Sequence, residues 1–182
     1  QMLNPSGGIE ADVTASCLKE NYFRVICPAL ARSHNKSHIL KNINREIKFK
    51  DVTDDFNCIG IFGPNSREFL NKLFGNFFSK ENFPFASGKF IPVLNQKIWF
   101  QRLSFVGELG WEIYIPKKIS TKIFEKIYKL GKKFNLGYSG MHTLDILRLE
   151  KKFLHWGHDI TSENNPIEAG LSFAINLKKK EN

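Results

Sequence analysis

The amino-terminal part of the chain alternates between apolar and polar residues, which is the pattern of a strand with one buried face. Residues 8–18 alternate in this way, a polar pair follows at positions 19–20, and residues 22–26 form a second apolar run. Two such runs joined by a short polar turn predict an antiparallel hairpin. Residues 29–43 then have apolar spacing typical of a helix. The inner face of that helix is expected to carry Leu30, His34, Ile39 and Ile43.

A strand followed by a capped helix is predicted next. Residues 58–62 form an apolar run, which the Gly-Pro pair at positions 63–64 ends. Asn65 then stands three residues before Glu68, which is the spacing of a capping box at the start of a helix. The inner face of this helix is expected to carry Phe69, Leu70 and Leu73.

Three further strands and two further helices are predicted towards the carboxyl end. The strands are residues 89–93, 97–106 and 111–115, and the helices are residues 121–134 and 141–153. The inward side chains are expected to be Ile123, Ile127 and Leu130 in the first helix and Leu144, Leu147 and Leu149 in the second.

The order of these elements indicates the fold class. A last apolar run, residues 171–177, predicts a final strand. Strands and helices do not alternate regularly, so we expect an α+β fold with mixed, largely antiparallel sheets and packed helices. The 182 residues are enough for one domain with a sizeable core.

The net charge of the chain excludes few classes of function. Lysine and arginine number 27 against 18 aspartates and glutamates, which gives a formal net charge of +9. Most of the cations are scattered lysines, and no stripe interleaves arginines with aromatic residues. We therefore expect a solvated lysine surface and no nucleic-acid partner. No apolar run approaches the roughly 20 residues that span a bilayer, so no membrane partner is expected.

The cysteines indicate a reducing compartment. Cys17, Cys27 and Cys58 have no paired spacing, and an odd count argues against the disulfide framework of a secreted protein. We expect the cytoplasm, or the mitochondrial matrix if the source is eukaryotic. Each cysteine lies in an apolar, strand-like stretch, so we expect buried thiols that bind no metal and form no disulfide.

The histidines do not match a metal motif. His34 and His38 are four residues apart, but the residues between them lack the glutamate of a helical zinc-protease motif. His155 and His158 have no cysteine pair nearby, and we expect them to form surface hydrogen bonds. The sequence also contains no nucleophile elbow, phosphate loop or dinucleotide fingerprint.

Two glycine-rich stretches place acidic residues on or beside predicted strands, at residues 4–12 and 102–112. The two-residue period of a strand puts Glu10 and Asp12 on the same side. Carboxylates so placed can meet in a cleft. Simpler roles also remain open: a turn or cap hydrogen bond for Asp12, and a salt bridge to a lysine for Glu112.

Five stretches, taken in order, carry a family resemblance. They are residues 4–12 (Asn-Pro-Ser-Gly-Gly-Ile-Glu-Ala-Asp), 56–68, 102–112, 144–151 and 156–171. These stretches resemble the glycine-cleavage T-protein (aminomethyltransferase) superfamily. Val-Gly-Glu-Leu-Gly-Trp-Glu and Trp-Gly-x-Asp-Ile-Thr are most similar to its dimethylglycine and sarcosine dehydrogenase branch. The T-protein itself usually has Thr-Gly-Glu-Asp-Gly-Phe-Glu and Tyr-Gly in these places.

The resemblance implies an aminomethyltransferase-like folate-binding fold, present in part. Residues 1–182 would be the central part of that module, without the flavin domain and the C-terminal β-barrel domain of its relatives. Tetrahydrofolate would be the cofactor, and FAD would belong only to the missing N-terminal domain. A flavin dehydrogenase domain in the same chain would be the expected partner.

The resemblance also implies residue roles. Asp12 would be the catalytic acid beside the reactive folate nitrogens, and Glu112 would bind the pterin ring. We accordingly expect Asp12 and Glu112 to point into one cleft between the lobes. Phe105, Glu108 and Trp111 would complete the cofactor site.

Two departures from the family pattern affect the expected folate affinity. Phe105 stands where relatives often have tyrosine, so a hydroxyl is missing. Leu144 precedes Asp145 where T-proteins often have a folate-contacting arginine.

The implied activity is tetrahydrofolate-dependent one-carbon transfer. The module would capture the methylene group of an iminium, formed by oxidation of dimethylglycine or sarcosine, as 5,10-methylenetetrahydrofolate. One alternative is a non-catalytic regulatory or interaction module of the same fold, and folate binding separates the two. Another is a folate-dependent demethylase acting on another methyl donor.

Overall fold

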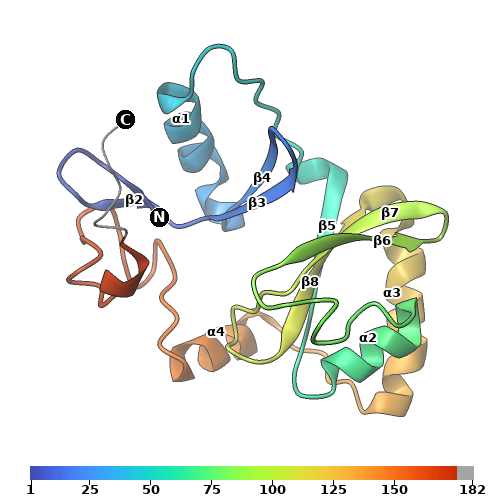
Figure 1. The fold of residues 1–182 in the computed structure, drawn as a ribbon. Helices are drawn as coiled ribbons and strands as arrows, with labels where there is room; N and C mark the ends of the chain where they lie inside the picture. Colours follow the sequence, from blue (N-terminus) through green and yellow to red (C-terminus); the bar gives the residue numbers. More distant parts are fainter. Residues whose placement is uncertain (176–182) are drawn as a thin grey trace. The chain divides into compact units, whose positions relative to one another are not determined.

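The chain forms two units. The computed structural model describes residues 1–175, which are coloured along the sequence in Figure 1. The first unit contains Gln1–Asp51 and the chain from Leu154 onward, and the second is Val52–Phe153. The chain therefore leaves the first unit after Asp51 and returns to it at Leu154.

The second unit is built on one four-stranded antiparallel sheet. Its order is β5 (Phe56–Phe62), β8 (Gly110–Pro116), β7 (Gln96–Gln101) and β6 (Gly88–Val93). The predicted strands are thus confirmed, but β7 ends at Gln101 rather than at position 106. The chain leaves the sheet at that point for a loop in which Gly107 has a φ of +69°, a backbone conformation outside a regular strand.

One face of this sheet is apolar and is covered by helices α2 (Ser66–Phe74) and α3 (Lys117–Gly131), as Figure 1 shows. On β8 the alternating residues Trp111, Ile113 and Ile115 are fully buried on that face. The helices contribute the predicted inner residues to the same core, in which Phe69, Leu70, Ile123 and Ile127 are buried and Leu73 and Leu130 partly buried.

The start of α2 differs from the prediction. The Asn65 side chain forms no capping hydrogen bond, so the expected capping box with Glu68 is absent. Instead Ser66 donates its backbone N–H to the Gly63 carbonyl (3.1 Å) and its hydroxyl to the Leu109 carbonyl (3.1 Å). A tertiary contact with the loop before β8 thus replaces the local cap.

The inner faces of two other helices also differ. In α4 (Met141–Glu150) Leu149 is 52% exposed, whereas Arg148 is buried because its guanidinium contacts Asp145 and the Phe153 carbonyl. In α1 (Arg32–Asn42), which follows the short 3₁₀ helix η1 (Ala29–Ala31), the buried residue is Asn35, and Leu30 is 91% exposed.

The first unit contains two small antiparallel pairs. Strand β1 (Met2–Leu3) pairs with β2 (Ile9–Ala11), and β3 (Thr14–Lys19) pairs with β4 (Tyr22–Ile26). The predicted hairpin is therefore confirmed, but its long first strand is broken after Ala11, because the segment before the break pairs with β1.

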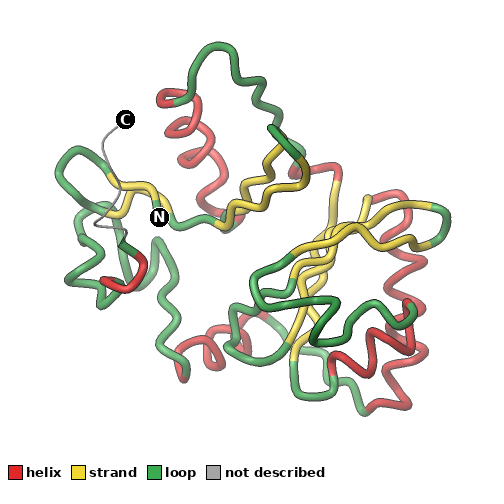
Figure 2. The backbone as a smooth tube through the Cα atoms, in the orientation of Figure 1, coloured by secondary structure: helices red, strands yellow, loops and turns green. Residues whose placement is uncertain are grey.

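The returning segment is mostly loop, as Figure 2 shows. The final strand predicted at residues 171–177 is wrong for its described part, because Ser172–Ala174 forms a 3₁₀ helix. Residues 176 and 177 lie outside the described residues.

The thiols are less buried than expected. Cys17 and Cys58 are exposed and Cys27 is half-buried, and all three are free cysteines. Cys58 lies on the sheet face opposite the core, because its neighbours Ile59 and Ile61 face inward. Across residues 1–175, no helix is both long and apolar enough to cross a membrane.

Candidate functional site

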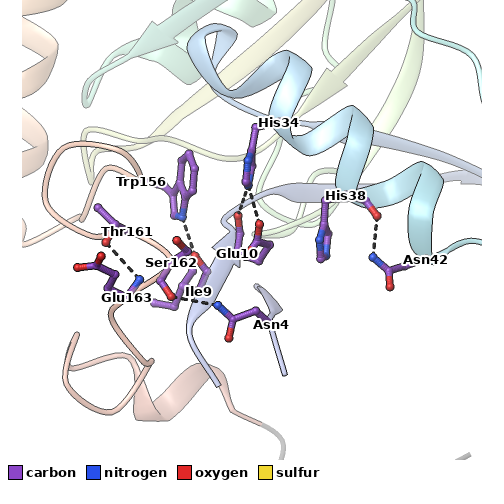
Figure 3. Close-up of polar contacts among 10 residues, drawn as sticks. All are labelled: Asn4, Ile9, Glu10, His34, His38, Asn42, Trp156, Thr161, Ser162 and Glu163. Carbon is purple, nitrogen blue, oxygen red and sulfur yellow. Dashed lines mark hydrogen bonds and ion pairs between the residues drawn. The ribbon is translucent and has the colours of Figure 1, made fainter. Parts of the chain in front are cut away.

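The glycine-rich amino-terminal motif packs against the last motif of the chain. The Asn4 side chain accepts hydrogen bonds from the backbone of Ser6 (3.0 Å) and Gly8 (2.8 Å), and it donates to the Ser162 carbonyl (3.1 Å). A Cβ atom at Gly8 would lie 1.9 Å from that carbonyl oxygen, so only glycine fits. Figure 3 shows this contact between segments 158 positions apart.

Strand β2, which leads to Asp12, is held by the same segment. Ile9 donates its backbone N–H to the Asn164 carbonyl (2.9 Å) and accepts a hydrogen bond from Trp156 Nε1 (2.7 Å). Ile9 and Ala11 are fully buried, whereas Glu10 and Asp12 are partly exposed. The predicted alternation of this strand is therefore confirmed.

Asp12 is a partly buried carboxylate without a hydrogen-bonding partner among residues 1–175. The simpler role of a turn or cap hydrogen bond is therefore wrong within that range. Burial raises the pKa of Asp12 above its ordinary value. A raised pKa suits a carboxylate that accepts a proton during a reaction.

This shift predicts a pH-dependent cost in stability. The folded protein holds the Asp12 proton up to a higher pH than the unfolded chain, whose carboxyl pKa is about 3.9. Stability is therefore lost as the pH rises through the window between the two pKa values. We expect Asp12→Asn to raise Tm at about pH 7 and to leave it nearly unchanged at about pH 3, where the carboxyl group is protonated in both states.

Thermal unfolding of the parent and the variant at the two pH values checks this prediction. Glu20→Gln, which alters an exposed acid in the same unit, serves as the control and should shift Tm little. A lower Tm for Asp12→Asn at neutral pH would show instead that Asp12 stabilises the fold.

Glu112 lies on the sheet face opposite the core and is held by neutral donors. Its Oε2 atom accepts hydrogen bonds from Gln101 Nε2 (2.8 Å) and from the Tyr114 hydroxyl. Gln101 is in turn positioned by Trp99 Nε1, which donates to Oε1 of Gln101 (3.2 Å). The alternative of a salt bridge is wrong among the described residues, because no lysine or arginine there pairs with Glu112.

The arrangement leaves one carboxylate oxygen for a ligand. Both protein donors use Oε2, and Oε1 accepts no hydrogen bond from residues 1–175. Burial, with the neighbouring Cys58 and Glu112 groups, raises the pKa of Tyr114, so the Tyr114 hydroxyl stays protonated and remains the donor. The carboxylate is thus oriented before any ligand binds.

Gln101 and Tyr114 were not predicted from the sequence. Tyr114 is two residues from Glu112 on β8, so strand period alone places it on the same face. Gln101 lies directly opposite Glu112 on β7, a register that no local pattern indicates.

An aromatic ring lies beside Glu112 on this face. The Phe62 ring covers Gly60 and Gly110, where a Cβ atom would lie 2.4 Å and 2.3 Å from ring atoms. Gly60 is the β5 partner of Glu112 in the sheet register. The two glycines therefore allow the half-buried Phe62 ring to lie flat against the strands.

The remaining predicted site residues have other surroundings. Trp111 is fully buried on the sheet face opposite Glu112, where it packs against Phe78, Phe83 and the guanidinium groups of Arg67 and Arg102. Glu108 forms an exposed ion pair with Lys151 (3.2 Å).

Phe105, which is also a predicted site residue, is half-buried in the loop between β7 and β8. Its ring centroid lies 6.4 Å from that of Phe153. The cofactor roles that the resemblance implies for Trp111 and Glu108 stay predictions. Phe105 stays a candidate.

Neither of two surface cavities of the second unit includes Glu112. One, of about 260 Å³, lies along α3 at Phe124 and Tyr128, and the other, of about 200 Å³, lies at the turn after β5. His155 and His158 stack on each other at 4.7 Å, and His155 donates its backbone N–H to Asp159 (2.7 Å). Among the described residues, no cluster of three histidines, cysteines or acids is placed to hold a metal.

Comparison with known proteins agrees with the motifs. Human mitochondrial sarcosine dehydrogenase is 34% identical over 97% of this chain, and mouse mitochondrial dimethylglycine dehydrogenase is 32% identical over 98%. The chain spans only 21% of either relative.

A solved structure and a family model extend the comparison. The crystal structure of glycine cleavage system aminomethyltransferase T from Bartonella henselae has the same fold, with a TM-score of 0.79 and 24% identity over 97% of this chain and 46% of that one. The expected α+β fold is thereby confirmed. The family model described as "GCVT N-terminal domain" matches residues 1–179, and the chain therefore belongs to that family.

Proposed function

We propose that this chain is the folate-binding part of an enzyme that transfers a one-carbon unit to tetrahydrofolate. The unit would be the methylene group of an iminium formed by oxidation of dimethylglycine or sarcosine, and the product 5,10-methylenetetrahydrofolate. The names of the two relatives support this donor class. The observation that carries the proposal is the Glu112 carboxylate, which two neutral donors orient without a neutralising cation.

Glu112 fits the chemistry of a pterin. A pterin ring presents an amino group and a ring N–H side by side, and a carboxylate oxygen accepts strong hydrogen bonds from such donors. Oε2 is fixed by Gln101 and Tyr114, so Oε1 has a defined direction for the first ligand donor. The Phe62 ring offers an apolar surface beside it.

Asp12 fits the role of proton acceptor. Tetrahydrofolate supplies the amine nitrogen that bonds to the methylene carbon. In our proposal, Asp12 accepts the proton that leaves this nitrogen as the new C–N bond forms, and its raised pKa favours that acceptance. Asp12 then returns the proton to the donor nitrogen as its bond to the methylene carbon breaks and the amine departs. The second folate nitrogen bonds to the same carbon and releases its proton to water. Holding the reactants in the required geometry would supply much of the remaining acceleration.

Several finer features remain part of the proposal. The oxidation that makes the iminium would occur in a flavin domain of the same protein, which would hold FAD. The compartment would be the mitochondrial matrix in a eukaryote, as the names of the two relatives suggest, or otherwise the cytoplasm. Folate-dependent transfer from another methylated amine would use the same two carboxylates.

Direct titration with tetrahydrofolate tests the proposal. We expect saturable binding to the full-length protein by calorimetry, with competition by 5-formyltetrahydrofolate. 5-Formyltetrahydrofolate is not an amine that the proposed flavin domain would oxidise, so this competition probes the folate site alone. Absence of saturable binding would contradict the proposed function and favour a non-catalytic interaction module.

A further inference from the structure

Two side chains from distant segments hold the backbone just before Asp12. Trp156 Nε1 donates to the Ile9 carbonyl (2.7 Å), and His34 Nε2 lies 3.0 Å from the Glu10 carbonyl oxygen. These are consecutive carbonyls of β2, as Figure 3 shows. The backbone is therefore fixed at two adjacent peptide groups immediately before the proposed proton acceptor.

The contacts of His34 define which ring nitrogen carries hydrogen. Nε2 lies near two acceptors, the Glu10 carbonyl oxygen at 3.0 Å and the Glu10 carboxylate Oε1 at 3.1 Å. An acceptor needs a donor opposite it, so Nε2 carries the hydrogen. His34 therefore binds both the backbone and the side chain of one β2 residue.

The two side chains also contact each other. The His34 and Trp156 rings stack with centroids 5.0 Å apart and an interplanar angle of 28°. Helix α1 and the returning segment thus meet over β2 through one aromatic pair (Figure 3). Movement of either ring would change the support of both carbonyls.

Stability alone does not explain this arrangement. The His34 side chain is 40% exposed and that of Glu10 is 20% exposed, and partly exposed ion pairs contribute little to stability. The arrangement instead sets the direction of the backbone. Asp12 has no hydrogen bond of its own among residues 1–175, so its carboxylate can be directed only through its backbone and rotamer.

We propose that His34 and Trp156 are positioning residues that aim the Asp12 carboxylate by holding the carbonyls of Ile9 and Glu10. This inference rests on the proposed function for its effect on rate, but its effect on Asp12 can be measured without folate.

Matched variants distinguish the effect of the hydrogen-bond donor of each residue from the effect of its stacked ring. His34→Phe keeps a ring for stacking but has no donor, whereas His34→Gln keeps an N–H donor but loses the ring. Trp156→Phe likewise removes the indole N–H donor but keeps a smaller aromatic ring for stacking. His38→Phe, one turn further along α1, is the control, because no hydrogen bond or ion pair joins the His38 side chain to β2 in Figure 3.

We expect His34→Phe and Trp156→Phe to lower the rate of 5,10-methylenetetrahydrofolate formation about 2- to 10-fold at saturating tetrahydrofolate, which is the range for one net hydrogen bond. The Kd for tetrahydrofolate should stay within about twofold of the parent value, because neither residue is proposed to contact folate. His34→Gln should recover most of the rate, and His38→Phe should match the parent.

A double variant tests whether the effect passes through Asp12. In an Asp12→Asn background, His34→Phe should cause no further loss of rate, because residues that act as a unit are not additive. An equal loss in both backgrounds would overturn the inference, since it would show a general structural effect. A rate for His34→Phe equal to that of the parent would overturn it as well.

A folate-independent measurement separates this inference from the proposed function. Carbon-13 NMR titration of the Asp12 carboxyl group should show its pKa moving towards the ordinary value in His34→Phe, because a less constrained side chain gains solvent. An unchanged titration would overturn the positioning role. If the parent binds no tetrahydrofolate but the titration shifts, the proposed function fails while the positioning role stands.

Discussion

Asp12→Asn in the full-length protein is expected to lower the formation of 5,10-methylenetetrahydrofolate by about 10²- to 10⁴-fold, the loss typical of a missing acid or base group. Asparagine has nearly the same shape, so folate should still bind, but its amide cannot accept the proton. Amine oxidation in the proposed flavin domain should continue almost unchanged. The methylene carbon that is not captured should then be released as free formaldehyde.

The measurement compares two rates in the same preparation. Flavin reduction reports amine oxidation, and product assay with excess tetrahydrofolate reports one-carbon transfer. Glu20→Gln, an exposed acid at the turn between β3 and β4, should leave both rates unchanged. A product yield in Asp12→Asn equal to that of the parent would show that Asp12 has no role in proton transfer.

Glu112→Gln is expected to act on binding instead. Gln101 and Tyr114 both donate to Oε2, so they should hold the oxygen of the new amide at that position. The amide NH₂ would then take the place of Oε1. It would be opposite an N–H group of the pterin, and two donors cannot form a hydrogen bond with each other. Loss of a hydrogen bond to a charged group costs about 1.5–3 kcal/mol, which corresponds to a roughly 10- to 150-fold higher Kd for tetrahydrofolate.

The two variants should differ at saturating folate. Glu112→Gln should regain most of its transfer rate there, because the proton acceptor is intact, whereas Asp12→Asn should not. Glu125→Gln, an exposed acid on α3, is the matched control in the same unit. A Kd for Glu112→Gln within twofold of the parent value would exclude Glu112 from the pterin site.

Much of the candidate site can be predicted from the sequence because it depends on local geometry. The two-residue period of strands correctly separates Glu10 and Asp12 from Ile9 and Ala11. The same period along β8 places Trp111 and Glu112 on opposite faces of the sheet.

The partners of these residues could not be predicted in this way. Gln101 reaches Glu112 through the register of two strands, and His34 reaches Glu10 across 24 positions. Helical spacing likewise identifies residues that share a face but not what packs against that face. Asn35 of α1 is buried and Leu30 of the preceding 3₁₀ helix is exposed for this reason, since neighbouring segments decide which side of each helix is covered.

The sequence by itself therefore determines the strand and helix order, the fold class and the family. It also determines on which face of a strand the carboxylates of Asp12 and Glu112 lie. These properties follow from periodicities of two and 3.6 residues and from motifs that are continuous in the chain. Only the tertiary structure decides that Asp12 lacks a hydrogen bond, that Glu112 is held by neutral donors and that His34 and Trp156 support β2. Those properties depend on strand register and on the packing of segments within each unit, which no local pattern of the sequence specifies.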